Sequence, residues 1–337
     1  MSRILFICGS INQTTQLHEV AGHLPGHDHF YTPYYADGLV EFARRLGGAE
    51  FTILGDKLRK RCLDYLEMRA LPLDLGGVRG GYDLVITCSD LLVPRNIRST
   101  KVVVVQEGIL DPPSFGLTLW KLFPVLPLWV AGTATTGLSG RYTRFCVASE
   151  GYRDYCVELG AKAERIVVTG IPNFDNCERY RANSFPHSNY VLVCTSDARE
   201  TFKGDDRGAF IARARQIAGG RQLIFKLHPN ENVERATSEI RALAEGALVF
   251  SQGSAEEMIA NCDVLITQYS STVFVGLALG KEVHSYFDLA TLKRLLPVQT
   301  GRAARDIAQV CLEVLEGTSP ERALDLGALP GLSVEAP

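Results

Sequence analysis

The sequence lacks several signatures that would assign a function class directly. It has no C-x-x-C pair, and its nine cysteines lie mostly within apolar runs, which favours buried reduced thiols over a disulfide framework. Lysine and arginine do not outnumber aspartate and glutamate, and the formal net charge is −3. The chain therefore has no overall excess of basic residues of the kind that binds nucleic acid. We therefore expect a cytoplasmic protein that has no nucleic-acid partner.

The sequence also lacks an uninterrupted apolar run long enough to span a bilayer. The segment 115–132, FGLTLWKLFPVLPLWVAG, comes nearest, but it has 18 residues and prolines at 124 and 127, which disfavour a spanning helix. Two interpretations stay open: a buried connector, or an aromatic-rich surface that contacts the inner face of a membrane or holds a lipid-linked substrate. The first apolar run breaks at Gly9-Ser10 without a cleavage-like site, so we expect a strand there rather than a signal peptide.

Short apolar strands alternate with amphipathic helical patterns along the whole chain, and this alternation predicts an α/β fold. The length of 337 residues suits two domains. The stretch 171–189 contains two prolines and four asparagines without periodicity, which is typical of a linker. We predict two tandem Rossmann-like, doubly wound domains at 1–170 and 190–317, followed by a loosely held tail at 318–337.

The expected elements of both domains can be given by residue range. Strands are predicted at 3–8, 50–54, 83–88, 101–106, 144–149 and 165–170, and then at 190–196, 221–229, 247–251, 263–268 and 282–288. Helices are predicted at 38–46, 56–71, 150–160, 206–218, 233–245, 254–261, 271–280 and 302–316. Residues 9–23 are predicted to be a loop rich in hydrogen-bonding side chains.

Polar residues follow three of the predicted strands, where ligands of open α/β sheets bind. Glu107-Gly108 follows a run of four valines, His228-Pro229 ends the strand at 221–229, and Ser270-Ser271 opens an apolar helix. A serine pair that caps a helix accommodates phosphate, because it adds hydroxyls to unpaired backbone N–H groups and the helix dipole. Taken singly, each motif has a structural explanation as well. Glu107 could be a solvated loop carboxylate, His228 a turn histidine bonded to the backbone, and each serine a plain N-cap.

In this order the three motifs resemble those of bacterial GT-B glycosyltransferases with cytidine-activated donors. These include sialyltransferases, the Kdo transferases of capsule synthesis and the glycerophosphotransferases of teichoic acid synthesis. The resemblance covers residues 83–288. It implies an inverting, metal-independent transfer from a nucleotide sugar, without a further cofactor, to a glycan or lipid-linked acceptor of surface polysaccharide or glycolipid synthesis. The sequence also lacks the D-x-D motif.

The resemblance implies a role for each motif. His228 contacts the donor phosphate together with Pro229, and Ser270 and Ser271 bind its remaining oxygens as the nucleotide leaves. Glu107 takes the proton of the acceptor hydroxyl as general base. The sialyltransferases place an acid first in this motif, whereas this chain has Gln106 there.

Further polar residues are candidates from their positions at strand ends. Facing the donor we expect Thr195, Ser196, Arg199 and Lys203, and Glu256, beside an N-cap at Ser254, as a ribose contact. Facing the acceptor we expect Gln16, His18 and Asp111. For Arg199 and Lys203 an exposed helix face is the more common explanation, and for Glu256 dipole complementarity is an equally good one. The histidines at 18, 23, 27 and 29 lack the H-E-x-x-H spacing, so no metal site is expected.

Two other functions stay open. The stretch 164–175, ERIVVTGIPNFD, looks like the interdomain passage of UDP-sugar 2-epimerases or hydrolases of the same architecture, although their acidic sets in the second domain are not visible. Gln106 favours the other alternative, a catalytically silent subunit that only binds a nucleotide sugar.

Overall fold

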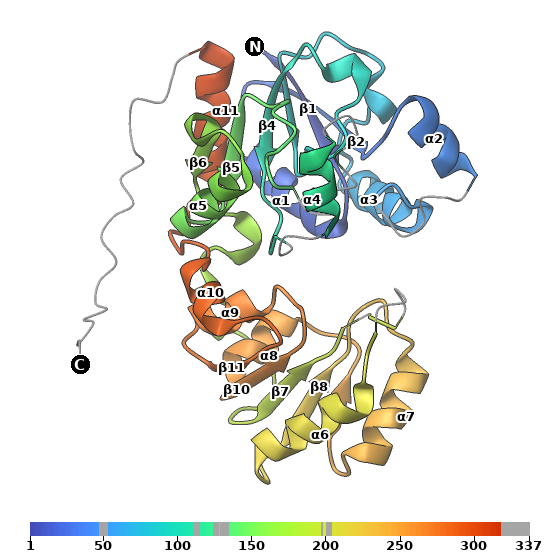
Figure 1. The fold of residues 1–337 in the computed structure, drawn as a ribbon, viewed down its shortest axis with the longest axis vertical. Helices are drawn as coiled ribbons and strands as arrows, with labels where there is room; N and C mark the ends of the chain where they lie inside the picture. The colour runs from blue at the N-terminus through green and yellow to red at the C-terminus, as the bar shows by residue number, and fades with distance from the viewer. Residues whose placement is uncertain are drawn as a thin grey trace, which may run out of the picture.

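The computed structural model describes residues 1–46, 53–110, 115–123, 128, 135–196, 198–199 and 204–317. They form two parallel β-sheets, each flanked by helices and lying one above the other along the long axis of the molecule (Figure 1). This is the predicted α/β fold with two Rossmann-like units. We call the parts built on the first and the second sheet the first and second units.

The first sheet has six strands in the order β2-β1-β3-β4-β5-β6. In that order they are β2 (Asp28–Pro33), β1 (Arg3–Cys8), β3 (Leu84–Thr87), β4 (Lys101–Val105), β5 (Arg144–Val147) and β6 (Ile166–Val168). The helices of this part of the chain are α1 (Ile11–Ala21), α2 (Gly38–Arg45), α3 (Asp56–Met68), α4 (Phe115–Leu122) and α5 (Glu150–Leu159). Its central strands are buried apolar runs, as expected for a sheet covered on both faces.

The second sheet has five strands in the order β11-β10-β7-β8-β9. In that order they are β11 (Glu282–His284), β10 (Val264–Thr267), β7 (Val191–Cys194), β8 (Leu223–Lys226) and β9 (Leu248–Phe250). The helices are α6 (Arg207–Ala218), α7 (Val233–Leu243), α8 (Ala255–Asn261), α9 (Val273–Ala278) and α10 (Leu289–Arg294). The predicted strands of this half are all present, and its predicted helices from 206 to 280 lie within two residues of their expected starts.

Two elements of the first unit differ from the prediction. The expected loop at 9–23 is helix α1, whose N-cap Ser10 accepts a hydrogen bond from the backbone N–H of Gln13. Strand β2 was not predicted, because its sequence DHFYTP carries no apolar run. Of the strand predicted at 50–54, residues 50–52 lie outside the described part, and Ile53 and Leu54 form a turn.

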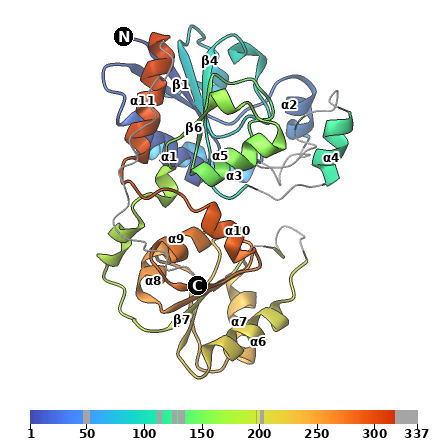
Figure 2. The same cartoon turned by 60° about the vertical axis from the view of Figure 1, so that its left-hand side comes forward.

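The last described helix, α11 (Ala303–Glu316), returns to the first unit. It packs against α1 and against strands β3, β4 and β5, and it lies beside the first sheet in both views (Figures 1 and 2). The carboxylate of Asp175 accepts hydrogen bonds from the N–H groups of Gly301 and Ala303, at 2.7 and 2.8 Å, where the chain crosses back. Sequence order groups residues 303–316 with the second sheet, but packing joins them to the first.

Helix α10 contacts the first unit at the start of α5. The hydroxyl of Ser149 donates to the carbonyl of Leu295 at 3.2 Å, and Val298 N–H donates to the carbonyl of Ala148 at 3.0 Å. A Cβ added at Gly151 would lie 2.1 Å from the carbonyl oxygen of Arg294. Gly151 therefore permits the close approach of the two units.

The nine cysteines are all buried, as predicted. Of the aromatic-rich segment 115–132, helix α4, Phe123 and Leu128 lie within the described part, and Leu122 and Phe123 are exposed. In the described ranges no helix combines the length and the apolar character that crossing a membrane requires.

Candidate functional site

A cavity of about 330 Å³ lies between the two units. The first unit contributes Asn12, Gln13 and Glu107 among others, and the second contributes Tyr269, Ser271 and Phe287. These residues follow the carboxyl ends of β1, β4, β10 and β11, which is where open parallel sheets bind ligands. The cavity thus brings together two sequence-predicted site residues, Glu107 and Ser271.

Glu107 is fixed by two side chains at the start of α1. Ser10 Oγ donates to Glu107 Oε1 at 2.6 Å, and Gln13 Nε2 donates to Glu107 Oε2 at 2.5 Å. Ser10 is also the N-cap of α1, so the carboxylate lies at the positive end of that helix dipole. The side chain is half-buried and lines the cavity. The carboxylate is therefore held in one orientation.

The loop before α1 has a glycine for a steric reason. A Cβ at Gly9 would lie 2.0 Å from Oε1 of Gln13, closer than nonbonded atoms approach. With glycine there, the Gln13 side chain folds back over the loop and reaches Glu107. Gly9 is thus required for one of the two contacts that orient the carboxylate.

Gln106 is fully buried and holds the turn that carries Glu107. Its Oε1 accepts from Ala148 N–H at 2.9 Å, and its Nε2 donates to the carbonyl of Gly108 at 2.7 Å. Its side chain therefore cannot take the place of a catalytic acid in the cavity. It joins the end of β4 to β5 and fixes the backbone on both sides of Glu107.

Gln16 and His18, the predicted acceptor contacts, do not line the cavity. Gln16 is buried, and its Nε2 donates to the carbonyl of Gln106 at 2.9 Å. His18 Nδ1 lies 3.0 Å from the hydroxyl of Tyr65, and burial lowers the pKa of His18. Both side chains are used in packing α1 against its neighbours. The third acceptor candidate, Asp111, lies outside the described residues.

Ser270 and Ser271 do not cap helix α9 as predicted. The N-cap is Thr272. The hydroxyl of Ser270 forms a local turn: it shares a hydrogen bond with the hydroxyl of Thr272 at 2.9 Å and accepts from Thr272 N–H at 3.4 Å. Ser271 lines the cavity. It lies close to the Glu107 loop, since a Cβ at Gly108 would be 3.9 Å from Cβ of Ser271.

His228 lies at the end of β8, outside the lining of this cavity. Its backbone N–H donates to Thr195 Oγ1 at 3.1 Å and to Glu231 Oε2 at 2.9 Å, and its Nδ1 accepts from Asn230 N–H at 3.3 Å. Pro229 is exposed. Strands β8 and β10 are separated only by β7, so His228 and Ser271 follow the same edge of the second sheet.

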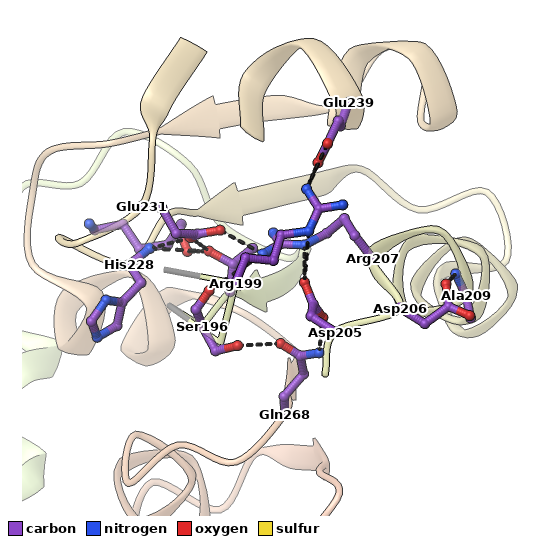
Figure 3. A network of polar contacts seen from close by, with 12 residues as sticks. Ser196, Arg199, Asp205, Asp206, Arg207, Ala209, His228, Glu231, Glu239 and Gln268 are labelled. Atoms are coloured by element: carbon purple, nitrogen blue, oxygen red, sulfur yellow. Dashed lines mark hydrogen bonds and ion pairs between the residues drawn. The ribbon is translucent and has the colours of Figure 1, made fainter. Parts of the chain in front are cut away.

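The other predicted donor contacts are engaged within the second unit (Figure 3). Ser196 Oγ donates to Gln268 Oε1 at 2.6 Å. Arg199 pairs with Glu239 at 2.6 Å and with Asp205 at 3.6 Å, so carboxylates already balance its charge. Lys203 lies outside the described residues.

Glu256 stands in the first turn of α8, whose N-cap is Ser254, as predicted. Ser254 Oγ donates to Glu256 Oε2 at 2.8 Å. Glu256 does not line the cavity that holds Glu107.

Several residues of the site were missed at the level of sequence. Gln13, Asn173 and Tyr269 line the cavity, and Ser10 orients Glu107 from outside the lining. An N-cap serine directly after the first strand is a signal that could have placed Ser10. Cys88 also lines the cavity, and its burial, followed by the charge of Glu107, raises the pKa of its thiol. Within the described ranges no group of three or more His, Cys, Asp or Glu side chains is arranged to hold a metal ion.

Comparison with known proteins places the fold in the GT-B class. The UDP-GlcNAc 2-epimerase of Methanocaldococcus jannaschii, in complex with UDP-GlcNAc and UDP, matches with a TM-score of 0.57 and 12% identity, covering 92% of this chain and 99% of that one. The Neisseria meningitidis UDP-GlcNAc 2-epimerase bound to UDP-GlcNAc matches with a TM-score of 0.53 and 11% identity, covering 94% and 100%.

A third solved structure belongs to a different enzyme class. The wall teichoic acid polymerase TagF, soaked with CDPG, matches with a TM-score of 0.50 and 10% identity, covering 94% of this chain and 89% of that one. No protein-family model and no curated protein matches the chain. At these identities the likeness shows the fold alone.

Proposed function

We propose that the chain is an enzyme that acts on a nucleotide-activated sugar, or on a glycerophosphate-like group, in the cavity between its two units. One observation carries the proposal. Glu107, oriented by Ser10 and Gln13, lines the same cavity as Ser271 of the second unit. A fixed carboxylate opposite a donor-side hydroxyl is the arrangement that a proton-transfer step at a bound nucleotide sugar requires.

The reaction that we favour is group transfer. The acceptor hydroxyl gives its proton to Glu107. With a sugar donor, its oxygen bonds to the transferred carbon and the bond from that carbon to the phosphate oxygen breaks; with a glycerophosphate-like group, its oxygen bonds to the transferred phosphorus and the bond from that phosphorus to the nucleotide oxygen breaks. The leaving nucleotide takes the electron pair of that bond. Ser271 supplies a hydrogen bond to its phosphate from the cavity lining, and His228, at the same edge of the second sheet but outside the lining, is the proposed contact for the part of the nucleotide that extends beyond the cavity; no metal is needed.

Transfer is favoured over other chemistry because Glu107 is the one carboxylate among the described residues that line the cavity. One base suffices to deprotonate an acceptor. The donor that we propose is cytidine-activated, which rests on the resemblance of the HP and SS motifs to those of cytidine-dependent transferases. A glycan or lipid-linked acceptor, and contact of residues 115–132 with a membrane, rest on the same resemblance and on that segment's composition.

The second candidate is 2-epimerisation of a UDP-sugar. It is favoured by the fold comparison, in which several matching structures are UDP-GlcNAc 2-epimerases. In that reaction Glu107 would remove the proton at C2 instead of a hydroxyl proton. A subunit that binds a nucleotide sugar without turnover is the remaining alternative.

One experiment separates these functions. The full chain is incubated with CMP-, CDP- and UDP-activated sugars, with and without a mixture of glycan and lipid-linked acceptors, and the products are analysed by mass spectrometry and by NMR of the sugar ring. Transfer gives an acceptor heavier by the donor group together with free nucleotide. Epimerisation gives a donor of unchanged mass and altered C2 stereochemistry. Binding without either product would contradict the proposal of an enzyme.

A further inference from the structure

Glu231, to which the sequence assigns no role, closes the turn that carries His228. Its Oε2 accepts from the backbone N–H of His228 at 2.9 Å and from the hydroxyl of Thr195. In return, the N–H of Glu231 donates to the carbonyl of His228 at 3.0 Å. The turn 228–231 is therefore closed by both the backbone N–H and the side chain of Glu231, and that side chain is 1% exposed.

The other oxygen of Glu231 joins the turn to a buried ionic network. Arg207 Nη2 donates to Glu231 Oε1 at 2.6 Å, and Arg207 Nε lies 3.1 Å from Asp205. The side chains of Arg207 and Asp205 are 3% and 0% exposed. Gln268 Nε2 donates to Asp205 Oδ1 at 2.7 Å, so the network connects the ends of β7, β8 and β10 (Figure 3).

Stability alone gives a poor account of this network. Removing charges from water is costly, and apolar residues that replace a buried ion pair often leave a protein equally stable or more so. The network does have a directional consequence, since two of its oxygen atoms, Thr195 Oγ1 and Glu231 Oε2, both accept from His228 N–H. The imidazole of His228 points away from Glu231 (Figure 3), toward space outside the network.

We infer that Glu231 is a positioning residue for His228. By holding the backbone N–H of His228, it sets the direction in which the imidazole leaves the turn. Arg207 keeps the Glu231 carboxylate in place from the opposite side. The inference rests on the proposed function only for the identity of the ligand that His228 meets, a nucleotide phosphate.

The first test is a double-mutant cycle on the affinity for CMP and CDP, measured by calorimetry. Glu231→Gln is expected to weaken binding by about tenfold, the effect of losing a hydrogen bond to a charged group. In the His228→Ala background the same substitution is expected to have no further effect, because its action passes through His228. Glu234→Gln, an exposed carboxylate in the first turn of α7, is the matched control and should leave affinity unchanged.

If Glu231→Gln weakened nucleotide affinity equally in the native and the His228→Ala backgrounds, the inference would be overturned. It would also be overturned if His228→Ala clearly weakened affinity while Glu231→Gln alone left it unchanged. Where Glu231→Gln fails to fold, Thr195→Val takes its place in the cycle. That substitution keeps the shape of the side chain and removes the other acceptor of the His228 N–H.

The second test does not depend on the ligand. In protein labelled with ¹⁵N-histidine, the side-chain signals of His228, assigned by their absence in His228→Ala, should shift in Glu231→Gln and stay in place in Glu234→Gln. If His228→Ala binds CMP and CDP as tightly as the native chain does, His228 does not contact the phosphate, and that part of the proposed function is wrong. A shifted His228 signal in Glu231→Gln would still support the positioning role of Glu231. An unshifted His228 signal in folded Glu231→Gln would overturn the inference.

Discussion

The hydroxyl of Ser10 donates a 2.6 Å hydrogen bond to the carboxylate of Glu107, 97 residues further along the chain. The same hydroxyl accepts from the backbone N–H of Gln13, in the first turn of helix α1, at 3.2 Å. One side chain therefore both caps α1 and orients the proposed base. The start of the first helix and the loop after the fourth strand of the chain are joined at the cavity.

Replacement of Ser10 should affect stability and turnover together. Ser10→Ala is expected to lower the free energy of unfolding by about 1 kcal/mol, the usual effect of a lost N-cap, and to slow turnover because Glu107 loses one of its two donors. Ser254→Ala is the control, since the hydroxyl of Ser254 caps α8 by accepting from Glu257 N–H, and Ser254 neither touches Glu107 nor lines the cavity. Thermal melts and steady-state rates compare the two variants. An equal effect of both on turnover would contradict the account.

Asp90 predicts a pH dependence of stability. It is buried, and burial raises the pKa of its carboxyl above the ordinary value, although Oδ2 accepts from Ser139 N–H at 3.1 Å. Because the folded state holds this proton more tightly than the unfolded state, the contribution of Asp90 to stability is present below about pH 4, the unfolded pKa, and is lost as the pH rises through the raised pKa.

Asp90→Asn removes that ionisation. The variant should be more stable than the native chain at neutral pH. The difference should shrink as the pH falls through the raised pKa of Asp90 toward about 4, below which both side chains are uncharged in the folded and the unfolded state. Melting temperatures measured from acidic to neutral pH check the trend. A difference that grows toward acid pH would show that the sign is wrong.

The close contact at Gly151 predicts a packing defect. Gly151→Ala should raise the helix propensity of α5, but the new Cβ meets the carbonyl of Arg294 at 2.1 Å. The expected net result is a loss of about 1–3 kcal/mol, as for other overpacked sites, with the two units held less firmly together. Gly204→Ala is the control, because nothing lies within 4 Å of a Cβ there. A Gly151→Ala protein that melts at or above the native temperature would contradict the packing argument.

Much of the fold could be predicted because its buried parallel strands are β-branched runs. The four valines of β4 and the sequence VLIT of β10 are such runs. Strand β2 was not predicted because its sequence, DHFYTP, mixes polar and aromatic residues without an apolar run, although its last three residues are buried. Its pairing with β1 identifies it. The packing of α11 against the first sheet was not predicted either, because it depends on tertiary contacts such as those of Asp175.

The candidate site was predictable in part because the predicted strands also fix where each strand ends. Strand ends located Glu107 and Ser271, because parallel strands deliver their carboxyl ends to one edge of the sheet. The order of strands and polar residues in the sequence could not show which polar side chains form hydrogen bonds or ion pairs within their own unit. Thr195 and Arg199 were expected to face a phosphate, but carboxylates of their own unit hold them.

The most direct test of the central claim, that Glu107 is the proton acceptor in the cavity, is the single-turnover rate of Glu107→Gln beside its nucleotide affinity. Turnover is measured with whichever activated sugar the product analysis identifies. We predict a folded variant that binds CMP and CDP as tightly as the native chain and turns over about 10²–10⁴-fold more slowly, the typical effect of a lost acid–base group. Turnover near the native rate in the folded variant would contradict the claim.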